Sequence, residues 1–158
     1  MKFEISNLQN FPLLKPVVTN RIWKAWWEPK GCKLQVISDF IESFPATRNI
    51  PFGLVAYENG NYVGSVLGII SDLELRPALT PWVAALWVDP AFRKHGVATA
   101  LMKATLTEIS ALGNAKAYLC ATAEKRSFYK KFGWQLIEER VGGDALDVFE
   151  IQSNYTVA

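Results

Sequence analysis

The segment 82–101 constrains the fold of this chain more than any other part of the sequence. It opens with an uninterrupted apolar run at 82–88, passes through a basic turn at 93–95, and continues from Gly96 into small residues. An apolar run that stops before Pro90 is typical of a central strand buried on both faces, because proline cannot donate to a sheet ladder. The residues after Gly96 predict a helix, and the unpaired N–H groups and positive dipole end of a helix start favour phosphate. The segment therefore predicts a phosphorylated ligand at the carboxyl end of a buried strand.

Length and composition predict one self-sufficient domain over 1–158. Half of the 158 residues are hydrophobic, which is enough for a core in a domain of this size. Lys and Arg number 17 against 15 Asp and Glu, a formal net charge of +2 that does not favour a nucleic-acid partner. Residues 1–10 lack the apolar core of a secretory signal, and no run reaches the ~18 apolar residues of a membrane span. We therefore expect a cytoplasmic protein with neither a nucleic-acid nor a membrane partner.

The cysteine and histidine content argues against a metal centre. Cys32 and Cys120 are too few for a disulfide framework and lack the spacing of metal ligands. His95 is the single histidine, which excludes a His-rich site. We expect no bound metal.

The periodicity of the remaining sequence predicts an α/β fold. The expected strands lie at 1–6, 52–57, 62–70, 82–88, 115–121, 134–139 and 146–151, and the expected helices at 16–27, 33–44, 97–112 and 124–132. The strand–helix–strand unit over 82–121 should be a right-handed crossover between parallel strands. Hairpins at either end of the chain then make the sheet mixed.

Two motifs resemble those of a known superfamily. The first is 93–98, Arg-Lys-His-Gly-Val-Ala, which follows a strand ending in Val-Asp-Pro. The second is 127–134, Ser-Phe-Tyr-Lys-Lys-Phe-Gly-Trp. In this order and context they resemble the pyrophosphate loop and the aromatic-tyrosine segment of the GNAT superfamily of N-acetyltransferases.

The resemblance implies a fold and a co-substrate. The fold would be a single-domain mixed central sheet flanked by helices and splayed between the parallel strands 82–88 and 115–121. Acetyl-CoA would place its pantetheine arm along the backbone edge of the first of these strands and its diphosphate on N–H groups at the helix start. The implied cofactor-binding residues are Leu86, Trp87, Val88, Arg93, Lys94, His95, Gly96, Val97, Ala98 and Thr99. For His95, a surface side chain without a role is an equally good interpretation.

The resemblance also implies a mechanism, in which a neutral amine attacks the thioester directly. A backbone N–H within 86–88 would stabilise the developing oxyanion. The motif match assigns Tyr129 the role of general acid toward the departing CoA thiolate. The alternative is that Tyr129 is a core or cleft aromatic, as its neighbours Phe128 and Phe132 are expected to be.

The sequence departs from the family pattern where many relatives carry a glutamate that acts as general base. The matching positions are 83–85, Val-Ala-Ala, without a carboxylate, and Thr122 stands where relatives often have asparagine. Asp72 or Glu74 of the loop 71–81 could supply the base, although a loop position favours the alternative that both are ordinary solvated acids. Otherwise the acceptor amine needs little help from a base because it is already partly neutral. This favours an α-amine, whose pKa is near ~8, over a lysine side chain, whose pKa is near ~10.4.

The acceptor side offers weaker signals. Trp27, Asp72, Glu74 and Arg76 are candidate substrate-binding residues. The alternatives are that Trp27 packs the first helix on the sheet and that Arg76 forms a surface ion pair rather than binding a substrate carboxylate. The expected acceptor is a small-molecule or peptide amine of unknown identity. The oligomeric state stays open, with the homodimer of many relatives as one alternative.

A second interpretation is a non-catalytic acyl-CoA-binding sensor or regulatory module. The absent strand glutamate favours it, whereas Tyr129 favours the enzyme. Release of free CoA thiol in the presence of amines would separate the two.

Overall fold

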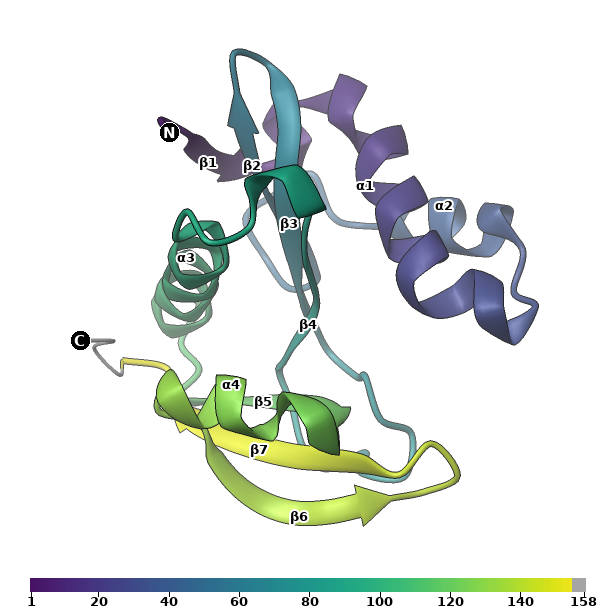
Figure 1. The fold of residues 1–158 in the computed structure, drawn as a ribbon, viewed down its shortest axis with the longest axis vertical. Coiled ribbons are helices and arrows are strands. Elements are labelled where there is room, and N and C mark those ends of the chain that lie inside the picture. The colour runs from purple at the N-terminus through teal and green to yellow at the C-terminus, as the bar shows by residue number, and fades with distance from the viewer. Residues whose placement is uncertain (155–158) are drawn as a thin grey trace. The chain divides into compact units, whose positions relative to one another are not determined.

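A computed structural model describes residues 1–154 (Figure 1). Its strands are β1 (Glu4–Asn7), β2 (Phe52–Glu58), β3 (Asn61–Ile69), β4 (Trp82–Val88), β5 (Lys116–Thr122), β6 (Gln135–Val141) and β7 (Leu146–Gln152). Its α-helices are α1 (Lys15–Ile22), α2 (Leu34–Glu42), α3 (Val97–Ala111) and α4 (Arg126–Lys131). Each expected strand and helix is present, with ends that move by a few residues. None of the helices within 1–154 is long and apolar enough to cross a membrane.

The strands pair in the order β1-β2-β3-β4-β5-β7-β6. The β4–β5 pair is parallel, with Trp82 opposite Tyr118, and α3 connects the two strands. The β1–β2, β5–β7 and β6–β7 pairs are antiparallel. The predicted mixed sheet with a parallel central pair is therefore confirmed.

The chain divides into two compact units, each built from separate stretches. The first comprises Met1–Leu67 and Ala85–Met102, and the second comprises Gly68–Ala84 and the residues from Lys103 onward. Both β4 and α3 therefore contribute one end to each unit.

The first unit packs helices against the hairpin β2–β3. Helices α1 and α2 lie side by side (Figure 1). The buried residues of α1, α2 and the hairpin include Val18, Ile22, Ile37, Ile41, Val55, Val63 and Val66. Burial of aliphatic side chains of this size contributes about 1.5–3 kcal/mol each, so this core stabilises the unit.

The predicted helix 16–27 extends to Trp27 as expected, but its last five residues have π-helical geometry. Residues Trp23–Trp27 form a π-helical turn rather than α-helix. There the Trp23 Nε1 donates to the Cys32 carbonyl at 2.6 Å, and Gly31 ends the segment with a φ of 77°. Short π-helical turns inside helices are often found at functional sites.

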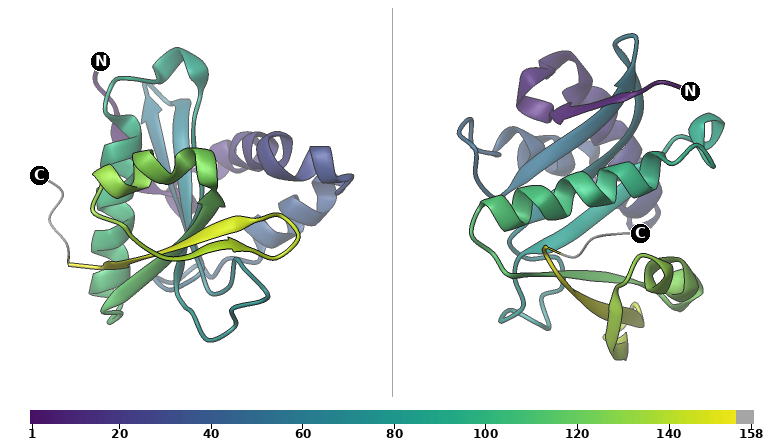
Figure 2. Two further views of the ribbon diagram at one scale, coloured as in Figure 1. Left: turned by 60° about the horizontal axis from the view of Figure 1, so that its bottom comes forward. Right: turned by 90° about the vertical axis from the view of Figure 1, so that its left-hand side faces the viewer.

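The second unit holds β5, β7 and β6, with α4 following β5. Figure 2 shows β6 and β7 as a long antiparallel hairpin. Buried Phe149 and Val148 of β7 lie opposite Leu119 and Cys120 of β5. The predicted helix 124–132 begins as a 3₁₀ turn, Ala123–Lys125, and becomes α-helical only at Arg126.

Candidate functional site

The end of β4 has an unusual backbone. Ala85 has a φ of 53°, which interrupts the extended conformation in mid-strand, where a non-glycine residue rarely adopts a positive φ. On the neighbouring strand, a Cβ on Gly64 would lie 2.8 Å from the Trp87 carbonyl oxygen. The backbones of β3 and β4 thus approach too closely for a side chain at this position. The residues Leu86 and Trp87 that follow the interruption are half-buried.

The loop between β4 and α3 presents backbone donors. Lys94 and Gly96 have φ values of 67° and 81°, and the N–H of Ala100 is the first to bond back to the Gly96 carbonyl, at 3.0 Å. Helix geometry leaves the preceding N–H groups of 97–99 without an acceptor in the helix. A Cβ on Gly96 would meet nothing within 4 Å, so the positive φ rather than lack of space requires glycine there. Amides in such left-handed turns form concave anion-binding surfaces.

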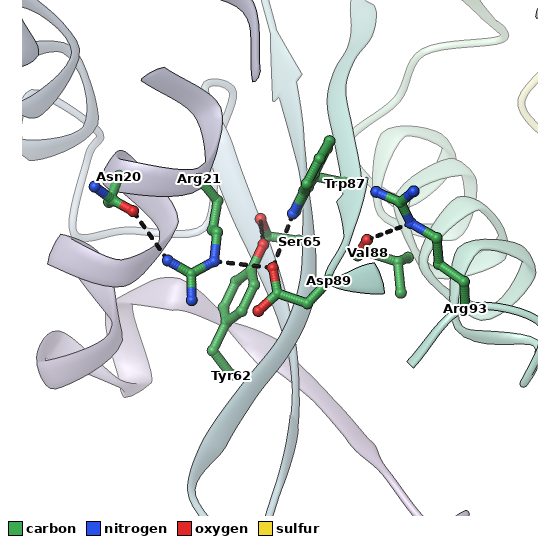
Figure 3. Close-up of polar contacts among 8 residues, drawn as sticks. All are labelled: Asn20, Arg21, Tyr62, Ser65, Trp87, Val88, Asp89 and Arg93. Atoms are coloured by element: carbon green, nitrogen blue, oxygen red, sulfur yellow. Dashed lines mark hydrogen bonds and ion pairs between the residues drawn. The ribbon is translucent and has the colours of Figure 1, made fainter. Parts of the chain in front are cut away.

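The side chain of Arg93 is turned back onto β4. Its Nε donates to the Val88 carbonyl at 2.9 Å, and its guanidinium carbon lies 4.7 Å from the centroid of the Trp87 ring (Figure 3). The guanidinium therefore supports the strand end. The backbone N–H of Arg93 donates to the Pro90 carbonyl at 3.4 Å, so a phosphate would have to compete with this bond.

Asp89 connects β4 to α1 in the first unit. Its Oδ1 accepts from the Trp87 Nε1 at 2.9 Å and from the Arg21 Nε at 2.8 Å. Arg21 also donates to Asn20 Oδ1 at 2.9 Å, and its guanidinium lies 5.5 Å from the ring centroid of Tyr62 (Figure 3). Sequence reasoning missed this network, because no local pattern links Arg21 with an aspartate 68 residues away.

An open groove of about 480 Å³ borders this network. It is lined by Asn20, Arg21, Lys24, Ala25, Trp87, Asp89, Pro90, Ala91 and Phe92. Close to the groove, the exposed Trp26 meets the Trp87 ring edge-on at 6.2 Å. Trp27, a predicted substrate-binding residue, is 38% exposed and lies 5.7 Å from the Lys30 ammonium. Trp27 is therefore not one of the buried residues of the core.

Tyr129 lies in the second unit, on α4, and is 8% exposed. Its ring packs at 5.7 Å from Phe149 and 5.1 Å from Phe128. Burial raises the pKa of the Tyr129 phenol to about 12, with a smaller contribution from Cys120. The phenol is therefore protonated at neutral pH, the state that a general acid needs.

A buried ion pair supports the start of α4. The Arg126 Nε donates to Asp147 Oδ2 at 2.8 Å, and the backbone N–H of Arg140 donates to Asp147 Oδ1 at 3.2 Å. The Asp147 side chain is fully buried. The hydrogen bond from Arg126 holds the pKa of Asp147 below its ordinary value. Arg126 and Tyr129 are one helical turn apart, so the pair also fixes the segment that carries the tyrosine.

The loop 71–81 holds the remaining candidates. Arg76 binds the Glu138 carboxylate, with its Nε 2.9 Å from Oε1, so the ion-pair alternative is the one that the structure contains. This hydrogen bond raises the pKa of Arg76 and lowers that of Glu138. Asp72 Oδ2 lies 3.3 Å from the Sγ of Cys120, whereas Glu74 is exposed.

Comparison with known proteins identifies the fold. The family model of the acetyltransferase (GNAT) domain matches residues 51–136. An aminoglycoside 6'-N-acetyltransferase complexed with coenzyme A has a TM-score of 0.73 and 15% identity, with 97% of this chain and 98% of that chain covered. Ard1 from Thermoplasma volcanium has a TM-score of 0.69 and 17% identity, with 96% and 98% covered. An acyl-CoA N-acyltransferase from Pseudomonas aeruginosa has a TM-score of 0.66 and 16% identity, with 94% and 97% covered.

At these identities the structural likeness concerns the fold. A comparison with curated protein sequences finds no match. The family model spans the β2–β3 hairpin, the loop at the start of α3 and the tyrosine helix α4. Because the match covers more than half of the 158 residues, the chain belongs to the GNAT family of acetyltransferases.

Proposed function

We propose that this protein transfers the acetyl group of acetyl-CoA to a primary amine of a small molecule or peptide. The observation that carries the proposal is the left-handed turn at Lys94 and Gly96, which opens the first amides of α3. A diphosphate matches such a donor array in charge and in hydrogen-bonding capacity. Family membership supports acetyl transfer in general, and the choice of an amine acceptor is part of the proposal.

Acetyl-CoA supplies an acetyl group activated as a thioester. The residues proposed to hold its diphosphate are those of the turn and the first helical turn, through their N–H groups, with a hydroxyl from Thr99. The donors are Arg93, Lys94, His95, Gly96, Val97 and Ala98. The exposure of the turn 93–96 supports this role, because a ligand reaches its amides from solvent. The backbone at Leu86, Trp87 and Val88 is proposed to align the pantetheine arm.

The reaction that we propose is a direct transfer. The lone pair of the amine forms a bond to the acetyl carbon, and the bond from that carbon to sulfur breaks. A backbone N–H of 86–88 stabilises negative charge on the acetyl oxygen. Tyr129 gives its phenolic proton to the leaving thiolate, and its burial and protonated state support this role.

Calorimetry and thiol release together test the proposal. We expect purified protein to bind acetyl-CoA and to release CoA thiol with at least one member of an amine panel. The panel contains a peptide α-amine, free lysine, a polyamine and an aminoglycoside. Binding of acetyl-CoA without thiol release from any member would favour the sensor interpretation, which the absence of a carboxylate at 83–85 supports.

A matched pair of glycine variants tests the loop itself. Gly96 and Gly113 flank α3, have φ values of 81° and 91°, and both leave open space for a Cβ. Alanine at either position costs about 1–2 kcal/mol of backbone strain, so both variants should lose similar stability. Only Gly96→Ala should weaken acetyl-CoA binding, by about tenfold, if the strain relaxes the donor turn. Equal affinity of the two variants for acetyl-CoA would contradict the assignment of the loop.

A further inference from the structure

One face of the second unit contains a carboxylate close to the positions where the family glutamate is missing. Trp82 of β4 is in parallel register with Tyr118 of β5, and their rings are 5.8 Å apart, so both side chains lie on one face. Side chains alternate along strands, which places Ala84 and Cys120 on that same face, two residues further along. Ala84 belongs to the stretch 83–85 that lacks a carboxylate.

Asp72 is the acid that reaches this face. The Sγ of Cys120 donates to its Oδ2 at 3.3 Å, and the aspartate is half-buried. The strand register places two other carboxylates on this face, and each is paired with a cation. Glu150 binds Lys116 at 2.9 Å, and Glu138, opposite Val148, binds Arg76. Glu150 also accepts from the Tyr118 hydroxyl at 3.3 Å. Asp72 is thus the acid that contacts β5 at Cys120, two positions after Tyr118.

The loop that carries Asp72 is held at several points. The Thr80 hydroxyl donates to the Ile70 carbonyl at 2.7 Å and ties the two ends of the loop together. Arg76 binds Glu138 of β6 through both carboxylate oxygens. A fixed loop keeps the Asp72 carboxylate in place without reorganisation, which is what a catalytic group requires.

Tyr129 and Asp72 reach β5 from opposite faces. Tyr129 packs on Phe149, which lies opposite Leu119, whereas Asp72 contacts the adjacent residue Cys120. Adjacent residues of a strand point to opposite faces. An acid on one face and a base on the other suit a reaction in which the amine arrives from one side and the thiol departs from the other.

We propose that Asp72 is the general base of the acetyl transfer and that the Cys120 thiol positions its carboxylate. The assignment depends on the proposed function and replaces the missing strand glutamate by a loop aspartate. As the nitrogen–carbon bond forms and the carbon–sulfur bond breaks, the proton lost by the amine goes to Asp72, directly or through water. The phenolic proton of Tyr129 goes to the departing sulfur.

The test measures kcat and kcat/KM for wild type and Asp72→Asn at one pH, using the amine of the panel that wild type acetylates fastest. We expect Asp72→Asn to lower kcat by about 10²–10⁴-fold. Acetyl-CoA affinity by calorimetry and the melting temperature should stay near the wild-type values. Asp39→Asn, on an exposed acid of α2 in the first unit, should match wild type in every readout.

Cysteine variants test the positioning role. Cys120→Ala should lower kcat about tenfold, because the Asp72 carboxylate loses the hydrogen bond that positions it. Cys120→Ser, which keeps a donor, should restore most of the rate.

The outcomes separate this assignment from the proposed function. Wild-type turnover in Asp72→Asn overturns the assignment and leaves acetyl transfer standing. The same holds if Glu74→Gln, rather than Asp72→Asn, loses the rate. A wild-type protein that binds no acetyl-CoA overturns the proposed function and this assignment together.

Discussion

Two arginine–aspartate ion pairs have the same nitrogen–oxygen distance but differ in how far their carboxylates are exposed to solvent. In the first unit the Arg21 Nε lies 2.8 Å from Asp89, and in the second unit the Arg126 Nε lies 2.8 Å from Asp147. The Asp89 side chain is 19% exposed, whereas that of Asp147 is fully buried. Removing one hydrogen bond to a buried charge costs more than breaking a solvated pair, because water cannot replace the lost partner.

The two pairs also lie beside different parts of the proposed chemistry. Asp89 connects Arg21 to Trp87 beside the open groove, next to the backbone proposed to align acetyl-CoA. Asp147 fixes the start of the helix that carries Tyr129. The comparison indicates that changes around β4 act on affinity, whereas changes around α4 act on rate and stability.

The largest effect that would sharpen this comparison is expected from Tyr129→Phe. Loss of the general acid should lower kcat by about 10²–10⁴-fold. Acetyl-CoA affinity should stay unchanged, because the substitution keeps the ring that packs on Phe149. Steady-state kinetics and calorimetry on the same preparation measure both quantities. Undiminished turnover would leave Tyr129 as a packing residue.

Stability should separate the two aspartates. Asp147→Asn should lower the free energy of unfolding by about 1.5–3 kcal/mol, because a buried charge-assisted hydrogen bond is lost. Asp89→Asn, its matched variant at the half-exposed pair, should cost only about 0.2–1 kcal/mol. Urea unfolding of both variants gives the comparison. Equal losses would show that burial does not distinguish the pairs.

Acid should remove the contribution of Asp147. Arg126 holds the pKa of this carboxyl below its ordinary value, so the folded state releases its proton more readily than the unfolded chain. The resulting stabilisation is fully present above about pH 4, the ordinary range of aspartate, and is lost as pH falls through the lowered pKa. The difference in free energy of unfolding between wild type and Asp147→Asn should therefore shrink below about pH 4. A difference that stays constant down to about pH 2 would contradict the role of this group.

Much of the site could be predicted from local sequence. The apolar run 82–88 matched β4, and the helix after Gly96 began at Val97 as expected. These elements depend on neighbouring residues: an apolar run, a proline that stops it, and a glycine with a positive φ.

The rest depends on tertiary packing that no local pattern records. An alanine rarely adopts a φ of 53°, so the sequence does not predict the break in the extended conformation of β4 at Ala85. Arg21 and Asp89 are 68 residues apart, and Asp72 and Cys120 are 48 apart. Tertiary packing also explains why the phosphate contact predicted from the basic side chain of Arg93 is not what the structure contains. The guanidinium donates to the Val88 carbonyl and stacks on the Trp87 ring instead.

The smallest predicted effect comes from Arg93. Arg93→Ala removes the guanidinium from the Trp87 ring, a contact that contributes about 0.5–1 kcal/mol at exposed sites, and frees the Val88 carbonyl. A loss of about 1 kcal/mol corresponds to a few-fold change in Kd, so acetyl-CoA affinity should fall only by that factor. Arg93→Lys keeps the charge but not the planar stacking group, so it should behave like the alanine variant if the arginine acts on the strand. Full affinity in Arg93→Lys with a large loss in Arg93→Ala would instead mean that the charge itself binds the diphosphate. Acetyl-CoA affinity would then depend on the Arg93 side chain rather than on the backbone amides at Gly96. The expectation that Arg93 acts by supporting the end of β4 would be wrong.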